Sequence, residues 1–133
     1  MPETKQIIFV VDDEESIRLF LKEELSDEGY EVTTFPNGET VLSTLEHICP
    51  DLVILDIRMP GIDGIKVLQR AKDQYPDLPV ILCSAYSDYK HDFGAWSADG
   101  YFVKSAQLGG LKDMIRSVLG PSSPRGEAPE TAA

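Results

Sequence analysis

The sequence predicts an α/β domain: a doubly wound, five-stranded parallel sheet with helices on both faces. Short and nearly continuous apolar runs recur along the chain, as in strands that are covered on both faces. Segments with apolar residues at helical spacing separate these runs. The 133 residues, of which 42% are hydrophobic, suffice for one domain with a substantial core and leave no room for a second.

Five apolar runs are the expected strands. The clearest are Ile7–Val11, Leu52–Leu55 and Val80–Cys83, and the weaker ones are Val32–Phe35 and Tyr101–Val103. Because helical segments and right-handed crossovers connect them, the expected strand order is 2-1-3-4-5, as in flavodoxin-like sheets. In such sheets ligands bind beyond the carboxyl ends of the strands, at the switch point between the first and third.

The expected helices lie between these strands. The first spans Glu15–Glu28, and Gly29 follows where a left-handed C-terminal cap requires it. A fourth helix around Asp88–Ala98 has the thinnest apolar stripe, and Gly94 interrupts it. Four sets of apolar residues at helical spacing indicate the first, second, third and last helices. In that order they are Ile17, Phe20, Leu21 and Leu25; Val41, Leu42, Leu45 and Ile48 before Pro50; Ile65, Leu68 and Ala71 before Pro76; and Leu108, Leu111, Ile115 and Val118.

Composition excludes several classes of protein. Twelve Lys and Arg against 23 Asp and Glu give a formal charge of −11, whereas surfaces that bind nucleic acid or anionic membranes need clustered basic residues. No apolar run approaches the roughly 20 residues that span a bilayer. Residues 1–6 lack the layout of a signal peptide, which favours the cytoplasm.

The last fourteen residues differ from the rest of the chain. Residues 120–133 contain three prolines and no large apolar side chain, so we expect a flexible tail or a linker after a domain of residues 1–119. Composition does not distinguish a tail from a linker.

Polar residues follow four of the five strands at their carboxyl ends. Asp12 and Asp13 follow the first strand, Asp56 the third, Ser84 the fourth and Lys104 the fifth. Singly, each has an ordinary explanation as a helix cap or a solvated residue. Together, three carboxylates need a counter-charge, because a pair about 4 Å apart repels by roughly 4 kcal/mol at an effective dielectric near 20. Mg²⁺ and the lysine fit that need, which indicates a phosphoryl-transfer site.

The most specific motif follows the third strand. It reads Asp56-Ile57-Arg58-Met59-Pro60-Gly61-Ile62-Asp63-Gly64. With the pair Asp12-Asp13, then Ser84-Ala85, then Tyr101 and Lys104 in the same order, the chain resembles the receiver domain of bacterial two-component response regulators over about residues 5–119.

The resemblance implies a signalling receiver that is activated by phosphorylation. Asp56 would accept a phosphoryl group from the phosphohistidine of a sensor histidine kinase or a phosphotransfer protein. Asp13, Asp56 and the backbone carbonyl of Arg58 would bind Mg²⁺, and Asp12 would act mainly through a water molecule on the ion. Such a domain is a phosphoacceptor rather than an enzyme, although it assists its own phosphorylation and dephosphorylation.

Switching is also implied by the resemblance. Ser84 and Lys104 would bind the phosphoryl oxygens, and the movement of the serine would leave space into which Tyr101 turns. The face formed by residues 88–98, the fifth strand and the last helix would then change and control a protein partner or a further domain. Arg58 and Tyr86, two residues beyond Asp56 and Ser84, would modulate the lifetime of the phosphoryl group.

Three departures from the family pattern fall on that expected output face. Ser105 stands where the family usually has a proline joined by a cis bond, which a serine makes unfavourable by about 2.5–4 kcal/mol. Ser97 stands where glycine is frequent, and Gly109-Gly110 weakens the start of the last helix.

The main alternative is a receiver-like docking module that is never phosphorylated. An electron carrier of the flavodoxin type is excluded, because the acids after the first strand would repel the flavin phosphate. A phosphatase of the haloacid type needs an aspartate where Arg58 stands.

Overall fold

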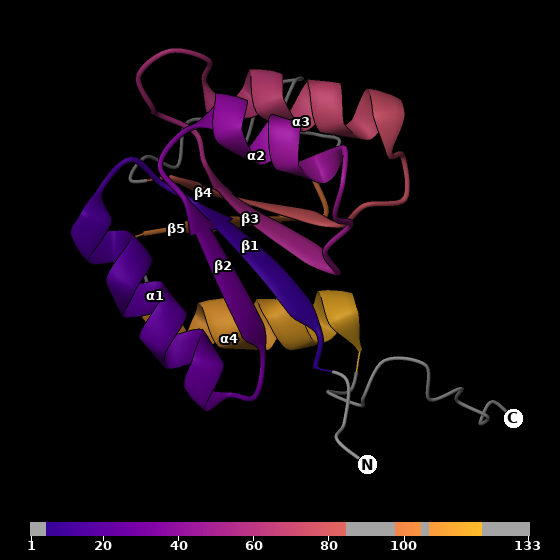
Figure 1. Ribbon diagram of the computed structural model, residues 1–133. Helices are drawn as coiled ribbons and strands as arrows, with labels where there is room; N and C mark the ends of the chain where they lie inside the picture. Colours follow the sequence, from indigo (N-terminus) through magenta and orange to yellow (C-terminus); the bar gives the residue numbers. More distant parts are fainter. Residues whose placement is uncertain (1–4, 85–97, 105–106, 121–133) are drawn as a thin grey trace, which may run out of the picture.

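The computed structural model describes residues 5–84, 98–104 and 107–120. Its strands and helices alternate along the chain, apart from the direct succession of β4 and β5 in the described part (Figure 1). In chain order they are β1 (Ile7–Val11), α1 (Glu15–Asp27), β2 (Glu31–Phe35), α2 (Gly38–Leu45), β3 (Leu52–Asp56), α3 (Gly64–Gln74), β4 (Val80–Ser84), β5 (Gly100–Val103) and α4 (Leu108–Leu119).

The five strands form one parallel sheet in the order β2-β1-β3-β4-β5. Helices α2 and α3 cover one face, and α1 and α4 cover the other (Figure 1). The predicted fold class, strand order and two-sided covering are therefore confirmed. Val11 lies opposite both Phe35 and Leu55, and Asp56 lies opposite Cys83, so the carboxyl ends of the strands meet at one edge.

The sheet separates two apolar cores, which explains the continuous apolar runs. Successive strand residues point to opposite faces: Phe9 and Val11 pack in the core beneath α2 and α3, whereas Ile8 and Val10 pack beneath α1 and α4. The strands β1, β3 and β4 thus have apolar side chains at nearly every position, and most of these are less than 3% exposed.

The helix ends follow local chemistry. Gly29, with φ of +98°, ends α1 in the predicted left-handed conformation, and its N–H donates to the Ser26 carbonyl at 3.0 Å. Asn37 caps α2 by accepting a hydrogen bond from the Thr40 N–H at 2.9 Å, and Asp63 caps α3 in the same way.

One predicted helix end is wrong, and two apolar residues expected on the buried faces of helices are exposed. The second helix ends at Leu45, and the N–H groups of His47 and Ile48 both donate to the Thr44 carbonyl in the turn that follows. Ile48 lies beyond that turn and is 49% exposed. Phe20, which was expected on the apolar stripe of α1, is 48% exposed, and α1 ends one residue before Glu28.

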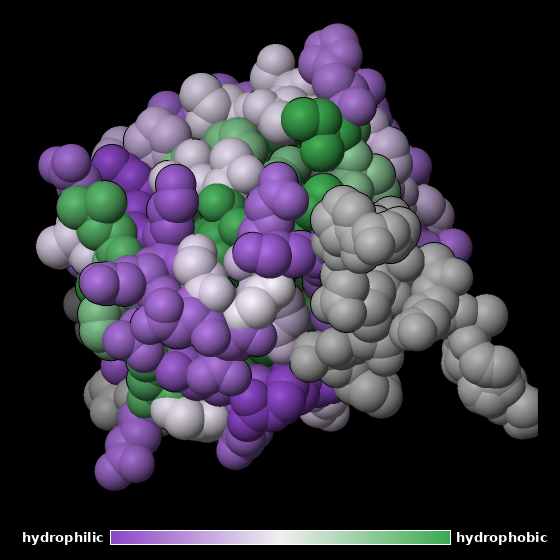
Figure 2. Space-filling view, turned by 60° about the horizontal axis from the view of Figure 1, so that its bottom comes forward, coloured by the Kyte–Doolittle hydropathy of each residue, from purple (hydrophilic) through white to green (hydrophobic). Residues whose placement is uncertain are grey.

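Part of the expected fourth helix, residues 88–97, lies outside the described residues, as do Tyr86, Ser97 and Ser105. Within the described part, no helix is both long and apolar enough to cross a membrane. The face shown in Figure 2 is mostly hydrophilic, and its apolar side chains form small separate patches.

Candidate functional site

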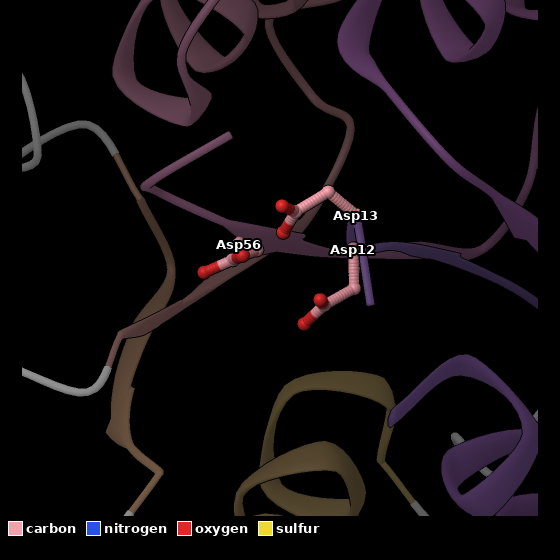
Figure 3. Close-up of side chains that lie close together, drawn as sticks. All are labelled: Asp12, Asp13 and Asp56. Atoms are coloured by element: carbon pink, nitrogen blue, oxygen red, sulfur yellow. The ribbon is translucent and has the colours of Figure 1, made fainter. Parts of the chain in front are cut away.

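Three carboxylates meet at the carboxyl edge of the sheet. Asp12 and Asp13 directly follow β1, and Asp56 is the last residue of β3. One oxygen of each lies within 4.8 Å of the others, and Figure 3 shows the three side chains around one space. Asp12 and Asp56 are only 3% and 5% exposed, whereas Asp13 is exposed. The predicted acidic cluster is therefore assembled by the fold.

Lys104 closes the site from the end of β5. Its backbone N–H donates to the Ser84 carbonyl at 2.7 Å, which continues the pairing of β5 with β4. Its Nζ lies 2.8 Å from Asp12 Oδ2 and 3.3 Å from Asp56 Oδ1. Burial alone would lower the pKa of Lys104, but the hydrogen bond to Asp12 and the attraction to both carboxylates raise it. The ammonium therefore stays charged and partly balances two buried carboxylates.

The environment of Asp56 makes its ionised form costly. Burial, and then the negative charge of Asp12, raise its pKa from the usual value to about 6, although the nearby Lys104 opposes the shift. The charge of Asp13 adds to the same effect. At neutral pH the site thus contains more negative charge than one lysine offsets, which is the electrostatic condition for cation binding.

The loop from β3 to α3 holds Asp56 at the sheet edge. The N–H of Ile57 donates to the Cys83 carbonyl at 3.1 Å, and the Gly64 N–H donates to the Ile57 carbonyl at 2.8 Å. Gly61 turns the loop with φ of +78°. Arg58 is exposed on this loop, two residues beyond Asp56.

The predicted switch residues lie on neighbouring strands. Ser84 ends β4 and is 1% exposed, opposite Val103 of β5. Tyr101 is half-buried in β5 and packs against the core beneath α2 and α3. The roles predicted for both, and for Arg58, concern the phosphorylated protein and stay predictions. Tyr86, the other residue expected to modulate the phosphoryl lifetime, lies outside the described residues.

An apolar cavity of about 290 Å³ lies beside the site, between α1 and α4. Asp12, Asp56 and Lys104 line it together with apolar side chains such as Ile17, Phe102 and Leu108. Cys83 also lines the cavity, and burial raises the pKa of its thiol to about 12, so this cysteine is no nucleophile at neutral pH.

One residue of the site was missed by the sequence analysis. Arg18, on the first turns of α1, donates from Nη1 to the backbone carbonyl of Asp12 at 2.7 Å. In the sequence its only signal is its place shortly after the acidic pair, which any solvated arginine near a helix start would share.

Comparison with protein families agrees with this geometry. A family model described as the response regulator receiver domain matches residues 8–116. Among curated proteins, the DNA-binding transcriptional regulator NtrC of Salmonella typhimurium is 48% identical over 82 residues, which are 62% of this chain and 18% of NtrC. The probable transcriptional regulator ycf27 of Guillardia theta is 40% identical over 119 residues, 88% of this chain and 46% of that protein. The chain thus spans less than half of these relatives.

Solved structures give the same result. The response regulator TrrA of Thermotoga maritima, in complex with Mg(2+)-BeF, is 46% identical, with a TM-score of 0.83 over 86% of this chain and 99% of TrrA. TrrA in complex with the histidine kinase ThkA gives a TM-score of 0.82 over the same shares of both chains, at 46% identity. The chemotaxis protein CheY4 of Vibrio cholerae is 26% identical, with a TM-score of 0.81 over 87% of this chain and 100% of CheY4.

Proposed function

Because the chain belongs to the family of response regulator receiver domains, we propose that Asp56 is the residue that accepts its phosphoryl group. Members of this family are phosphoacceptors in signalling and not enzymes of the ordinary kind. The observation that carries the assignment is the position of Asp56: a buried carboxylate at the end of the central strand, beside Asp12, Asp13 and Lys104.

The donor atoms at this site fit a magnesium ion. All three side chains offer carboxylate oxygens, the ligand type of hard divalent cations, and one lysine leaves their charge incompletely balanced. Asp13 and Asp56, with the backbone carbonyl of Arg58, would hold the ion, and Asp12 would act mainly through its charge and a water molecule. When bound, Mg²⁺ offsets the negative charge of the carboxylates and of the transferring phosphoryl group. The Mg(2+)-BeF complex of TrrA supports this choice of ion.

The transfer step uses the ionised Asp56 carboxylate as the nucleophile. An Asp56 oxygen forms the new P–O bond while the P–N bond to the histidine of the donor breaks, and the leaving imidazole takes up a proton. With a pKa of about 6, Asp56 is mostly ionised at neutral pH. Lys104, now 3.3 Å from Asp56 Oδ1, and the Ser84 hydroxyl would bind the oxygens of the attached phosphoryl group.

Signal output follows from the added charge and acceptors. Lys104 follows β5 and precedes α4 in the chain, so its shift from a carboxylate to a phosphoryl group would reach both elements, which are part of the predicted output face. Ser84 and Tyr101 would rearrange with it. Water later hydrolyses the acyl phosphate with the help of the same site, and Arg58 and Tyr86 would set the rate.

The partners proposed for the domain are a sensor histidine kinase, or a phosphotransfer protein, and a downstream protein or further domain. The complex of TrrA with the kinase ThkA supports the former, and the greater length of NtrC supports the latter. Such signalling would take place in the cytoplasm. The acidic domain itself would not bind nucleic acid or membranes.

The test is phosphorylation by a small phosphodonor. With Mg²⁺ and acetyl phosphate, mass spectrometry should find one base-labile phosphoryl group on the wild-type protein and none on the variant Asp56→Asn. The variant Asp73→Asn, which removes an exposed aspartate on α3, should be modified like the wild type. An unmodified wild type would favour the docking module instead, and an adduct that persists in Asp56→Asn would refute the assignment of Asp56.

A further inference from the structure

The Arg18 side chain reaches back from α1 to the chain that carries the acidic pair. Its Nη1 donates to the Asp12 backbone carbonyl at 2.7 Å, while its own N–H lies in the first turn of α1, bonded to the Glu14 carbonyl at 3.1 Å. The carbonyl of Asp12 belongs to the peptide group that joins Asp12 to Asp13. The arginine therefore fixes the plane of that peptide group.

Every polar group of Asp12 has a partner. The N–H donates to the Phe35 carbonyl at 3.1 Å, and Oδ1 accepts from the Glu14 N–H at 2.9 Å. Oδ2 accepts from Lys104 Nζ at 2.8 Å, and the carbonyl accepts from Arg18. Asp12 is also only 3% exposed. Burial and these four hydrogen bonds therefore hold Asp12 in place where the chain leaves the sheet.

Asp13 has no comparable support. It is exposed, and no side-chain hydrogen bond holds its carboxylate among the residues that the structure describes. Its direction toward Asp56 (Figure 3) depends on the backbone, and therefore on the peptide group that Arg18 holds. We propose that Arg18 is a positioning residue of the cation site: through the Asp12 carbonyl it aims the Asp13 carboxylate for divalent metal binding. This inference rests on the proposed function, because it concerns the same metal site.

The sign of the effect distinguishes positioning from charge. Arg18 is a cation whose Nη1 lies 2.7 Å from the Asp12 carbonyl, so the loss of its charge alone would make the site more negative and would tighten the binding of a divalent cation. The loss of positioning would weaken that binding, since groups that orient metal ligands contribute roughly 10-fold or more to affinity. The two effects of the variant Arg18→Met are therefore opposite.

The experiment measures the dissociation constant of Mn²⁺ by electron paramagnetic resonance, without any phosphodonor. Arg18→Met should bind Mn²⁺ roughly 10-fold more weakly than the wild type, and Arg18→Lys, which keeps a donor and the charge, should recover part of the loss. Lys22→Met is the matched control, because it removes the same charge from an exposed position of the same helix. It should leave Mn²⁺ binding unchanged or slightly tighter.

Urea unfolding in EDTA measures the free energy of unfolding of each variant, and so separates a loss of positioning from a general loss of structure. If Arg18→Met binds Mn²⁺ as tightly as Lys22→Met or more tightly, the inference is overturned. If Arg18→Met does not fold, Arg18→Lys decides. Because the lysine side chain is shorter than that of arginine, its donor lies farther from the carbonyl, which should weaken Mn²⁺ binding at an unchanged unfolding free energy. Wild-type affinity of Arg18→Lys would refute the inference. If the wild type binds no Mn²⁺, or if Asp13→Asn binds Mn²⁺ as tightly as the wild type, the metal site of the proposed function is refuted instead.

Discussion

Lys104 supplies a positive charge at the acidic cluster. It contacts Asp12 at 2.8 Å and Asp56 at 3.3 Å, so the weaker of its two contacts is with the proposed phosphoacceptor. A phosphoryl group on Asp56 would compete for the same ammonium with more charge and more acceptor oxygens. The site is thus held by an ion pair that the proposed phosphoryl group on Asp56 would exchange without breaking the contact of Lys104 to Asp12.

The raised pKa of Asp56 makes a prediction about stability. Because the folded protein holds the Asp56 proton up to about pH 6, and the unfolded chain releases it near its usual pKa of about 4, ionisation of Asp56 lowers the free energy of unfolding as the pH rises through this window. Above pH 6 the loss is complete. In EDTA, Asp56→Asn should therefore be about 1–3 kcal/mol more stable than the wild type at pH 7, and much less so near pH 4.

Urea unfolding of both proteins between pH 4 and pH 7.5 measures this difference. The exposed control Asp73→Asn should follow the wild type at every pH. A difference between Asp56→Asn and the wild type that does not grow from pH 4 to pH 6 would contradict the burial and repulsion argued for Asp56.

The acids and Lys104 could be predicted from the sequence, because a parallel sheet brings the carboxyl ends of its strands to one edge. Their contacts could not. Which carboxylate is closest to Lys104 depends on the directions of the side chains, and the spacing of residues in the sequence does not specify these. The hydrogen bond from Arg18 to the Asp12 carbonyl depends on how α1 packs on the sheet. The expected roles of Tyr86 and Ser105 are predictions about residues outside the described part of the chain.

The start of α3 is tied to Asp56 through a glycine. A Cβ atom on Gly64 would lie 2.2 Å from the Asp56 carbonyl oxygen and 2.7 Å from Ile57 Cα, and both are backbone atoms that cannot rotate away. The first residue of the helix thus packs directly against the end of β3. Helix α3 can approach the site this closely only because that residue has no side chain.

Two glycine substitutions should have opposite effects. Gly64→Ala should lower the free energy of unfolding by about 2–3 kcal/mol through the clash with β3. Gly109→Ala should raise it by about 0.5–1 kcal/mol, because Gly109 lies in helix α4 with open space where its Cβ would point. Urea unfolding of both variants tests the pair, and equal effects would contradict it.

The strands were predicted better than the end of the second helix. The apolar runs of β1, β3 and β4 match their predicted ranges within one residue, because two-sided burial leaves an unambiguous pattern. Helix α2 was predicted too long, because Ile48 continues the helical spacing of apolar residues. The turn that ends the helix at Leu45 is made by backbone groups, and these have no signature in the side-chain pattern.

Helices α1 and α4 are joined by charge as well as by their shared core. Lys112 of α4 lies 3.1 Å from Glu24 and 3.3 Å from Glu28 of α1, and Arg116 lies 3.4 Å from Glu28. These pairs are partly exposed, so each stabilises the protein only slightly. Glu24 and Glu28 are thus acids of the helix surfaces that have basic partners. Asp12, Asp13 and Asp56 form a separate set, of which Asp12 and Asp56 are buried.

Within the described residues, the apolar core extends to the end of α4. Ile115 is fully buried, Val118 and Leu119 pack against the core beneath α1 and α4, and the Gly120 N–H donates to the Arg116 carbonyl at 2.8 Å. With the tail-like composition of residues 121–133, these contacts predict that the chain truncated after Gly120 keeps its unfolding free energy within about 0.5 kcal/mol. Truncation after Ser117 removes two apolar core contacts and should cost about 2 kcal/mol or more. Urea unfolding of the two truncated chains is the measurement, and a marked loss already at the longer truncation would mean that the tail packs on the domain.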